Sequence, residues 1–479
     1  MKTAEFDKES VSSHKGKWTG IAGILFAVGL AIMAAAWFIP HKVDRGDKAA
    51  PSHKEEKKEH SMNDYTIPAA KKAVPTAAEE KGEKKAEGKD HKDDGHGDGH
   101  GHRHEAYVEK TDEEVNKSYK FLTYLTSLIF YASIALGGLI FVLIQHLTRA
   151  GWSVAVRRLT EGAMMNVILV AIGLIPVIIF KDSIFLWVSE KNVADGHFHH
   201  AWHAKHAYLN SGFFNIRMIV YIALWVLFAV TLFQKSTGQD ETKDPKTTIW
   251  MGKLSAPGIA VYALSSTFFI FDVMMSLEYG WFSTIYGVIY FAGSMIAIMA
   301  FTILAANLLQ KKGYLKGAVT TEHYHDMGKL MFAFMIFWGY TAFSQYILIR
   351  YPDIPEETIW YLNRWESGWK PVALFVFIFH FCLPFLLLMS RHVKRNKTTV
   401  ALMAIWMLVA HYIHIYWQVM PTVTYPTQIP FQGFVISDIL MPIGMGLVFV
   451  GGFLFFLKDK NLVPVGDPRL EESLKFQNH

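Results

Sequence analysis

The chain has 479 residues, of which 51% are hydrophobic and 14% aromatic, and its formal net charge is +5. Its single cysteine, Cys382, excludes an internal disulfide, a Cys-ligated iron–sulfur cluster and a C-x-x-C-H haem attachment. The sequence has no Walker loop and no G-x-G-x-x-G motif before a helix, so neither nucleotide hydrolysis nor dinucleotide binding is predicted, and no nucleic-acid partner is expected.

Long apolar runs dominate the sequence. About 20 residues at 1.5 Å rise cross a ~30 Å hydrocarbon core, so a run of about 18 or more predicts a transmembrane helix. Ten runs qualify: 18–39, 121–145, 162–180, 213–234, 256–277, 284–309, 330–349, 371–390, 399–419 and 436–457. The first is longer than the apolar part of a cleavable signal peptide, and Pro40 follows it. The sequence therefore predicts an all-α polytopic membrane protein with ten transmembrane helices.

The distribution of Lys and Arg predicts the orientation. Placing the N-terminus inside gives the inner loops far more positive charges than the short outer loops. Both termini are then cytoplasmic, and we expect a bacterial inner membrane protein. The predicted regions are a tail with the first helix (1–40), an outer loop (41–120), a nine-helix core (121–460) and a cytoplasmic tail (461–479).

The predicted outer loop, 41–120, consists mainly of Lys, Glu, Ala, Gly and His, with few large apolar side chains to offset chain entropy by burial. It is predicted to be mostly disordered. Its end is rich in imidazole and carboxylate, a composition that can bind Zn²⁺, Cu²⁺ or Ni²⁺ loosely. The candidate ligands are His96, His100, His102 and His104, but a solvated low-complexity linker is the favoured interpretation.

Asp272 is the most informative residue, because it lies inside an apolar run that is long enough to cross a membrane. A carboxylate in hydrocarbon costs at least about 2.5–3.5 kcal/mol, so it needs a partner or a role. Arg217 is predicted near the same outer level, and His411 and His414 share one helix face in the outer half. His380 is placed nearer the midplane.

Other interpretations apply to most of these groups. Arg217 could extend to the interface, Asp438 could cap the last helix, and His380 could be a buried, hydrogen-bonded histidine. On the inner side, Glu161 is expected to open the third helix. A second inner group is expected to precede the seventh helix as a polar loop: Glu322, His323, His325 and Asp326.

Quinol oxidation needs a hydrogen-bond partner and a base for the headgroup, with apolar or aromatic walls around the ring. Asp272, as proton relay or quinol base, and the imidazoles of His411 and His414 are the predicted catalytic groups. Asp272, Arg217, His411 and Trp281 are the predicted quinone contacts.

Several segments resemble the large membrane subunits of alternative complex III, which belong to the NrfD/PsrC-type superfamily of ten-helix, quinone-interacting proteins. They are Gly151–Gly162, Tyr208–Arg217, Met275–Gly287, His323–Trp360 and His411–Pro421, and the resemblance covers roughly 120–460. Its most specific part is His325–Glu357. The chain departs from its relatives at Glu278, where they often carry a Pro-His pair.

The resemblance implies a component of a quinol:cytochrome c (or other acceptor) oxidoreductase, acting on menaquinone or ubiquinone and lacking a redox metal of its own. It implies two four-helix bundles, helices 2–5 and 6–9, with helices 1 and 10 apart. Iron–sulfur clusters and c haems would lie in partners: an iron–sulfur/molybdopterin-like subunit and pentahaem and monohaem cytochrome c subunits. A sister NrfD-like membrane subunit and a terminal oxidase would be further partners. A lone first helix followed by a long His-rich outer loop resembles the second quinone-binding subunit of these complexes.

Four alternatives stay open. The chain could be a structural membrane anchor of such a complex, or the sister NrfD-like subunit that oxidises quinol. It could be a dihaem b-type cytochrome that uses His380 with His411 or His414 as axial ligands. A secondary transporter is the fourth, although Pro257, Pro384 and Pro442 form no matched pair of interrupted helices.

Overall fold

The computed structural model describes residues 10, 15–39, 111–189, 197–423, 430–431 and 433–478. Within these ranges the regular elements are helices, and ten of them are long and apolar enough to cross a membrane. The prediction of an all-α, multi-pass membrane protein is confirmed.

Seven spans are single helices, and the third, fifth and eighth are interrupted or extended. The single helices are α1 (Lys15–Phe38), α2 (Asp112–Leu147), α7 (Ser211–Thr242), α9 (Tyr286–Lys311), α10 (Thr321–Arg350), α15 (Lys397–Val419) and α17 (Ile436–Leu457). The third span joins η3 (Gly151–Ser153), α3 (Val154–Met164) and α4 (Val167–Ile179), and the fifth continues from α8 (Pro245–Val273) into η6 (Met275–Glu278). The eighth contains α12 (Lys370–Phe375), a π-helical segment η7 (Val376–Cys382) and α13 (Leu383–Met389).

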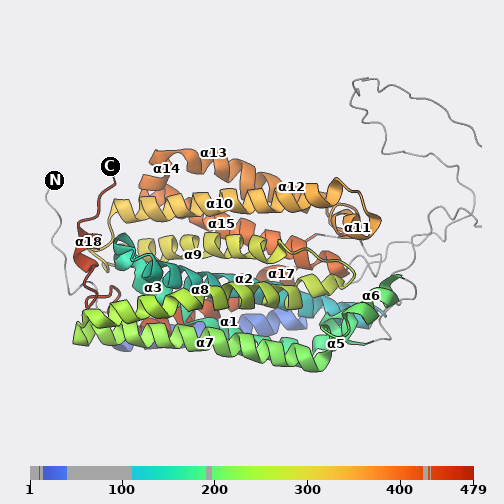
Figure 1. Cartoon of the computed structure of the whole chain (residues 1–479), viewed down its shortest axis with the longest axis horizontal. Coiled ribbons are helices and arrows are strands. Elements are labelled where there is room, and N and C mark those ends of the chain that lie inside the picture. Colours follow the sequence, from blue (N-terminus) through green and yellow to red (C-terminus); the bar gives the residue numbers. More distant parts are fainter. Residues whose placement is uncertain are drawn as a thin grey trace, which may run out of the picture. The chain divides into compact units, whose positions relative to one another are not determined.

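The spans form the predicted arrangement of two bundles and a separate pair. Helices α2, α3–α4, α7 and α8 pack together as the first bundle, and α9, α10, α12–α13 and α15 form the second (Figure 1). Helix α1 packs closely along α17, which in turn contacts α2.

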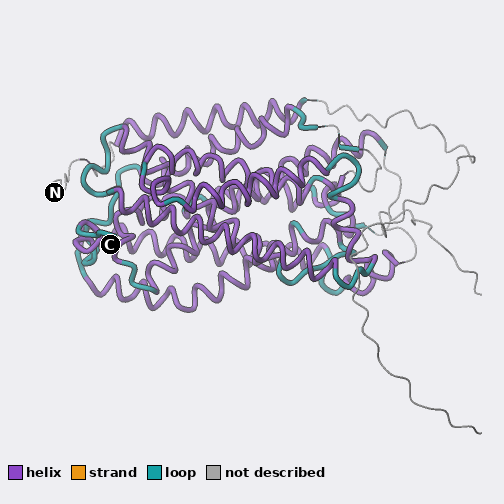
Figure 2. The backbone as a smooth tube through the Cα atoms, turned by 90° about the horizontal axis from the view of Figure 1, so that it is seen from above, coloured by secondary structure: helices purple, strands orange, loops and turns teal. Residues whose placement is uncertain are grey.

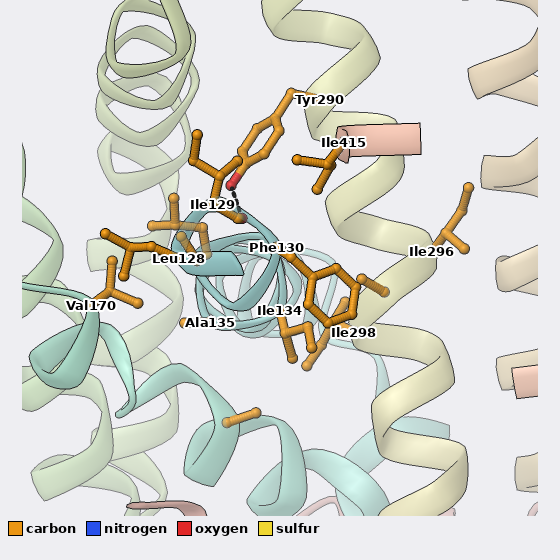
Figure 3. Packing of buried hydrophobic residues seen from close by; sticks show 14 of the residues in the cluster. Leu128, Ile129, Phe130, Ile134, Ala135, Val170, Tyr290, Ile296, Ile298 and Ile415 are labelled. Carbon is orange, nitrogen blue, oxygen red and sulfur yellow. Dashed lines mark hydrogen bonds between the residues drawn. The ribbon is translucent and has the colours of Figure 1, made fainter. Parts of the chain in front are cut away.

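Helix α2 is the member of the first bundle that packs against the second bundle, and it is almost entirely covered. Figure 3 shows Leu128, Ile129 and Phe130 of α2 among side chains from neighbouring helices. The Tyr290 hydroxyl on α9 donates a hydrogen bond of 3.1 Å to the carbonyl of Ile129. Because α2 contacts α8 on one side and α9 and α15 on the other, it joins the two bundles.

Short helices and loops gather at the two ends of the bundles (Figure 2). At one end lie α5 (Lys181–Ile184), α6 (His197–Lys205) and α11 (Pro355–Asn363) (Figure 1). At the opposite end lie α14 (Arg391–Arg395) and α18 (Leu470–Leu474). Following the predicted orientation, we name the first the outer end and the second the inner end.

Three predicted boundaries are wrong because polar residues extend the helices. Helix α2 begins at Asp112 rather than 121, since Thr111 and Glu114 form a capping box with acidic residues in the first turn. Glu161 lies inside α3 and does not open a helix. The group from Glu322 to Asp326 lies in the first turns of α10 rather than before it.

Candidate functional site

Asp272 and Arg217 form a buried, two-pronged ion pair near the outer end of the first bundle. Arg217 on α7 donates from Nε to Asp272 Oδ2 at 2.9 Å and from Nη2 to Oδ1 at 2.7 Å. Asp272 on α8 is fully buried, and Arg217 is 7% exposed. This geometry is the strongest form of carboxylate–guanidinium contact, and it ties α7 to α8.

The remaining groups of the pair are also satisfied. The Tyr221 hydroxyl donates to Asp272 Oδ2 at 3.0 Å, and Arg217 Nη1 donates to the carbonyl of Tyr208 at 2.8 Å. The guanidinium lies over the rings of Tyr208 and Phe213, at 3.8 and 4.4 Å from their centroids. Arg217 therefore does not extend into the interface. It is enclosed with its acid partner.

A cluster of three histidines lies in the second bundle. His380 on η7 is 5.4 Å from His414 and 6.0 Å from His411, measured between ring centroids, and the two α15 histidines are 6.2 Å apart. Trp338 of α10 packs edge-on against His380 at 4.2 Å and His414 at 4.9 Å. We call His380, His411 and His414 the imidazole cluster.

Local backbone features position the imidazole cluster. Pro384 has no N–H for the carbonyl of His380 four residues earlier, and the helix widens to a π-helix over Val376–Cys382. On α9, a Cβ at Gly293 would lie 2.4 Å from His411 Cε1, so only glycine leaves room for that ring. Interrupted helices of this type are frequent at functional sites.

The imidazole cluster is buried but only partly hydrogen-bonded. His411 Nε2 contacts Ser133 Oγ at 3.1 Å, and His414 Nε2 contacts Gln418 Nε2 at 2.8 Å. Both nitrogens of His380, the Nδ1 atoms of His411 and His414, and Nε1 of Trp338 have no partner among the described residues. Buried polar atoms are normally paired with protein or ordered water, so these nitrogens are available to water or a ligand as far as the described residues go.

A polar series leads from the imidazole cluster to the outer end. Gln418 contacts His414 through its side-chain amide, and its backbone carbonyl accepts a hydrogen bond from Arg364 Nη2 at 2.6 Å. Arg364 Nη1 in turn lies 2.6 Å from Glu278 Oε1, and the Glu278 side chain is 11% exposed. Trp281 stacks on Trp360 at 4.7 Å, and Arg364 lies over the face of that Trp360 ring.

On the inner side of the cluster the lining is different. One face of α10 carries buried methionines at four-residue intervals, and α15 adds two more. They are Met327, Met331, Met335, Met403 and Met407. Thioether side chains neither donate nor exchange protons. The polar series thus continues outward from the imidazole cluster, while a methionine-lined stretch separates it from the inner end.

The predicted site residues therefore lie in two places rather than one. Asp272 and Arg217 belong to the first bundle, and His411 and His414 belong to the second. The predicted quinone contacts are all buried, with exposed fractions of 0% for Asp272, 1% for His411 and 3% for Trp281. A headgroup can touch them only if side chains move.

Two further predictions concern Asp438 and metals. Asp438 accepts from the backbone N–H of Val435 at 3.0 Å, as a helix cap does, and also from the hydroxyls of Tyr119, Thr123 and Tyr416. In the described part of the chain, no group of three or more His, Cys, Asp or Glu side chains is arranged to hold a metal ion. His96, His100, His102 and His104 lie outside the described residues.

No protein-family model matches the chain, and no curated protein matches its sequence. The sequence predicted neither the pairing of Glu278 with Arg364 nor the position of Trp338. A helical stripe was the available signal for Trp338, because it continues the buried face of Met331 and Met335.

Proposed function

We propose that the chain is the second quinone-binding membrane component of a quinol:cytochrome c (or other acceptor) oxidoreductase of the alternative complex III type. In this role it supplies a protonatable interior and carries no redox metal of its own. The observation that carries the proposal is the imidazole cluster, with its unpartnered ring nitrogens, inside a membrane-spanning bundle. Imidazole is the side chain that exchanges protons most readily near neutral pH.

The polar series of Gln418, Arg364 and Glu278 gives proton movement from the imidazole cluster an outward direction. Protons released from quinol near the outer end would pass between His380, His414 and water, and leave past Gln418, Arg364 and Glu278. The methionine-lined stretch would keep this path from reaching the inner end. A quinone, menaquinone or ubiquinone, would be oxidised at or beside this protein, and its electrons would go to iron–sulfur clusters and c haems of partner subunits in a bacterial inner membrane.

A structural anchor is the second candidate, and the Asp272–Arg217 pair favours it. Every oxygen of this carboxylate and every nitrogen of this guanidinium is engaged, as expected of a pair that holds α7 against α8. We assign helix anchoring to the outer half of the first bundle and proton transfer to the imidazole cluster.

The test is made in the assembled complex. The variant His414→Gln keeps similar volume and hydrogen bonding but has no ring nitrogen that can take up and release a proton. We expect the complex to assemble with its haem-bearing subunits and to lose quinol:acceptor turnover by at least roughly tenfold, since positioned acid–base groups contribute about 10²–10⁴-fold. The control is His392→Gln, an exposed histidine in α14. Full turnover in His414→Gln would contradict the proton role.

A further inference from the structure

The inner end of the first bundle contains a second buried polar group that the proposed function does not use. Arg157 Nη2 donates to Asp467 Oδ2 at 2.6 Å, and Arg158 Nη2 donates to Asp240 Oδ2 at 2.8 Å. Glu161 lies between the two arginines, 3.3 Å from Arg157 Nε and 3.3 Å from Arg158 Nη1. With Arg469, which also binds Asp467, these residues form what we call the inner network.

The inner network connects three parts of the chain. Arg157, Arg158 and Glu161 come from α3, Asp240 from α7, and Asp467 and Arg469 from the C-terminal segment. His146, on the last turn of α2, lies close enough to Arg157, Arg469 and Asp467 to interact electrostatically with their charges. Burial alone raises the pKa of the Asp467 carboxyl, but Arg157 and Arg469 outweigh it and hold the pKa well below its ordinary value, so this carboxyl is ionised.

Several atoms of this group have no protein partner. Arg157, Arg158, Glu161 and His146 are all at most 2% exposed. Yet both ring nitrogens of His146, Arg157 Nη1, Arg158 Nε and Arg469 Nη1 make no hydrogen bond within the described residues. Leaving so many buried polar atoms dry is costly, and native structures rarely do so.

The charge balance of the inner network indicates which kind of group can bind to these unpartnered atoms. Three guanidinium groups face three carboxylates in the inner network, so it is neutral without a further ion. A bound anion would add a buried, uncompensated charge. Water can accept hydrogen bonds from the arginines and donate them to Glu161 and His146.

We propose that His146 and the inner network together bind ordered water. With about three hydrogen bonds to each buried water molecule, the unpartnered atoms call for about two or three molecules. These waters complete the contact between α2, α3 and the C-terminal segment. The proposal does not depend on the proposed function, because it rests on the inner network alone.

The direct test is a density map of the assembled complex at a resolution that reveals ordered water. We expect peaks within about 2.7–3.2 Å of a His146 ring nitrogen and of Arg157 Nη1. Continuous side-chain packing with no peak would overturn the proposal. So would a single peak that is replaced by bromide, identified by its anomalous signal, because it would mean a bound anion.

A pair of variants gives an independent test with opposite signs. His146→Leu removes both unpartnered nitrogens at similar volume, whereas His146→Asn keeps a hydrogen-bonding side chain. If the site is hydrated, leucine leaves the bound water without a hydrogen-bond partner at position 146. The leucine variant should then melt at least about 2 °C below the asparagine variant. If the site is dry, leucine should melt at the same temperature or higher, which contradicts the proposal. His392→Leu, at an exposed position, is the control for the substitution itself.

Discussion

The outer halves of the two bundles both place titratable side chains in the membrane interior, but they treat them differently. In the first bundle, Asp272 and Arg217 are opposite charges whose polar atoms are all engaged. In the second, the imidazole cluster and Trp338 leave five buried nitrogens without a partner in the described chain. In the first region the side chains pair with one another, whereas in the second the described residues leave nitrogens available to water or a ligand.

The difference supports the proposed division of a structural role for the first bundle and a chemical role for the second. A buried carboxylate whose oxygens are all held by guanidinium and hydroxyl groups has no oxygen left to exchange a proton with water. An imidazole with an unpartnered nitrogen can still form a hydrogen bond with water, which is the contact that proton exchange needs. The most unusual residue in the sequence, Asp272, thus belongs to the region better suited to holding helices. The histidines, which taken singly look ordinary, form the region better suited to proton transfer.

Arg217→Met should produce the largest effect on folding. It leaves Asp272 as a buried charge, and breaking such a pair costs about 3–5 kcal/mol. We expect a large loss of folded protein in detergent, measured by thermal unfolding. The double variant Arg217→Met/Asp272→Leu should recover much of the loss, because replacing both partners of a buried pair is often neutral. Parent-like stability in the single variant would mean that the pair contributes little.

Asp272→Asn should have the next largest effect on folding and assembly. It places an amide N–H against the Arg217 fork and removes a charged hydrogen bond, which costs roughly 1.5–3 kcal/mol. We expect a lower yield of assembled complex. Asp272→Glu keeps the charge with altered reach and should assemble better than the asparagine variant, as judged by size-exclusion chromatography. Equal assembly of the two would show that charge at this position does not stabilise the bundle.

Gly293→Ala tests the packing of α9 against His411 in the second bundle. The new Cβ would lie 2.4 Å from His411 Cε1, so the ring that contacts Ser133 must shift. Overpacking of this kind costs about 1–3 kcal/mol. We expect reduced turnover along with reduced stability. The control is Gly23→Ala, since a Cβ at Gly23 meets nothing within 4 Å.

Ser133→Ala should have the smallest effect. It removes the partner of His411 Nε2 and so one hydrogen bond, worth about 0.5–1.5 kcal/mol. The His411 ring then gains one more unpartnered nitrogen. We expect a small decrease in the unfolding midpoint and a measurable change in turnover, compared with Ser294→Ala on α9, whose hydroxyl bonds only its own helix. No change in either quantity would indicate that His411 lies outside the functional group.

The sequence predicted the ten spans because hydropathy acts over about 20 residues, and it placed Asp272 and Arg217 at one level because helices alternate in direction. It misplaced the starts of α2, α3 and α10, where capping and buried ion pairs extend helices through polar residues. The grouping of His380 with His411 and His414 depends on how helices rotate against one another. Likewise, Glu278 and Arg364 are 86 positions apart, and only packing brings them together.

The most direct test of the central claim compares His380→Phe with Asp272→Asn in the same assembled complex. Phenylalanine fills the space of the imidazole and removes two unpartnered nitrogens, so the complex should assemble nearly normally. The measurement is quinol:acceptor turnover per assembled complex, with proton release to the outer side recorded in parallel. We predict that His380→Phe loses at least roughly tenfold in turnover, whereas the surviving Asp272→Asn complex retains parent-like specific activity. Full activity in His380→Phe together with loss in Asp272→Asn would contradict the account and return the proton-transfer role to the first bundle.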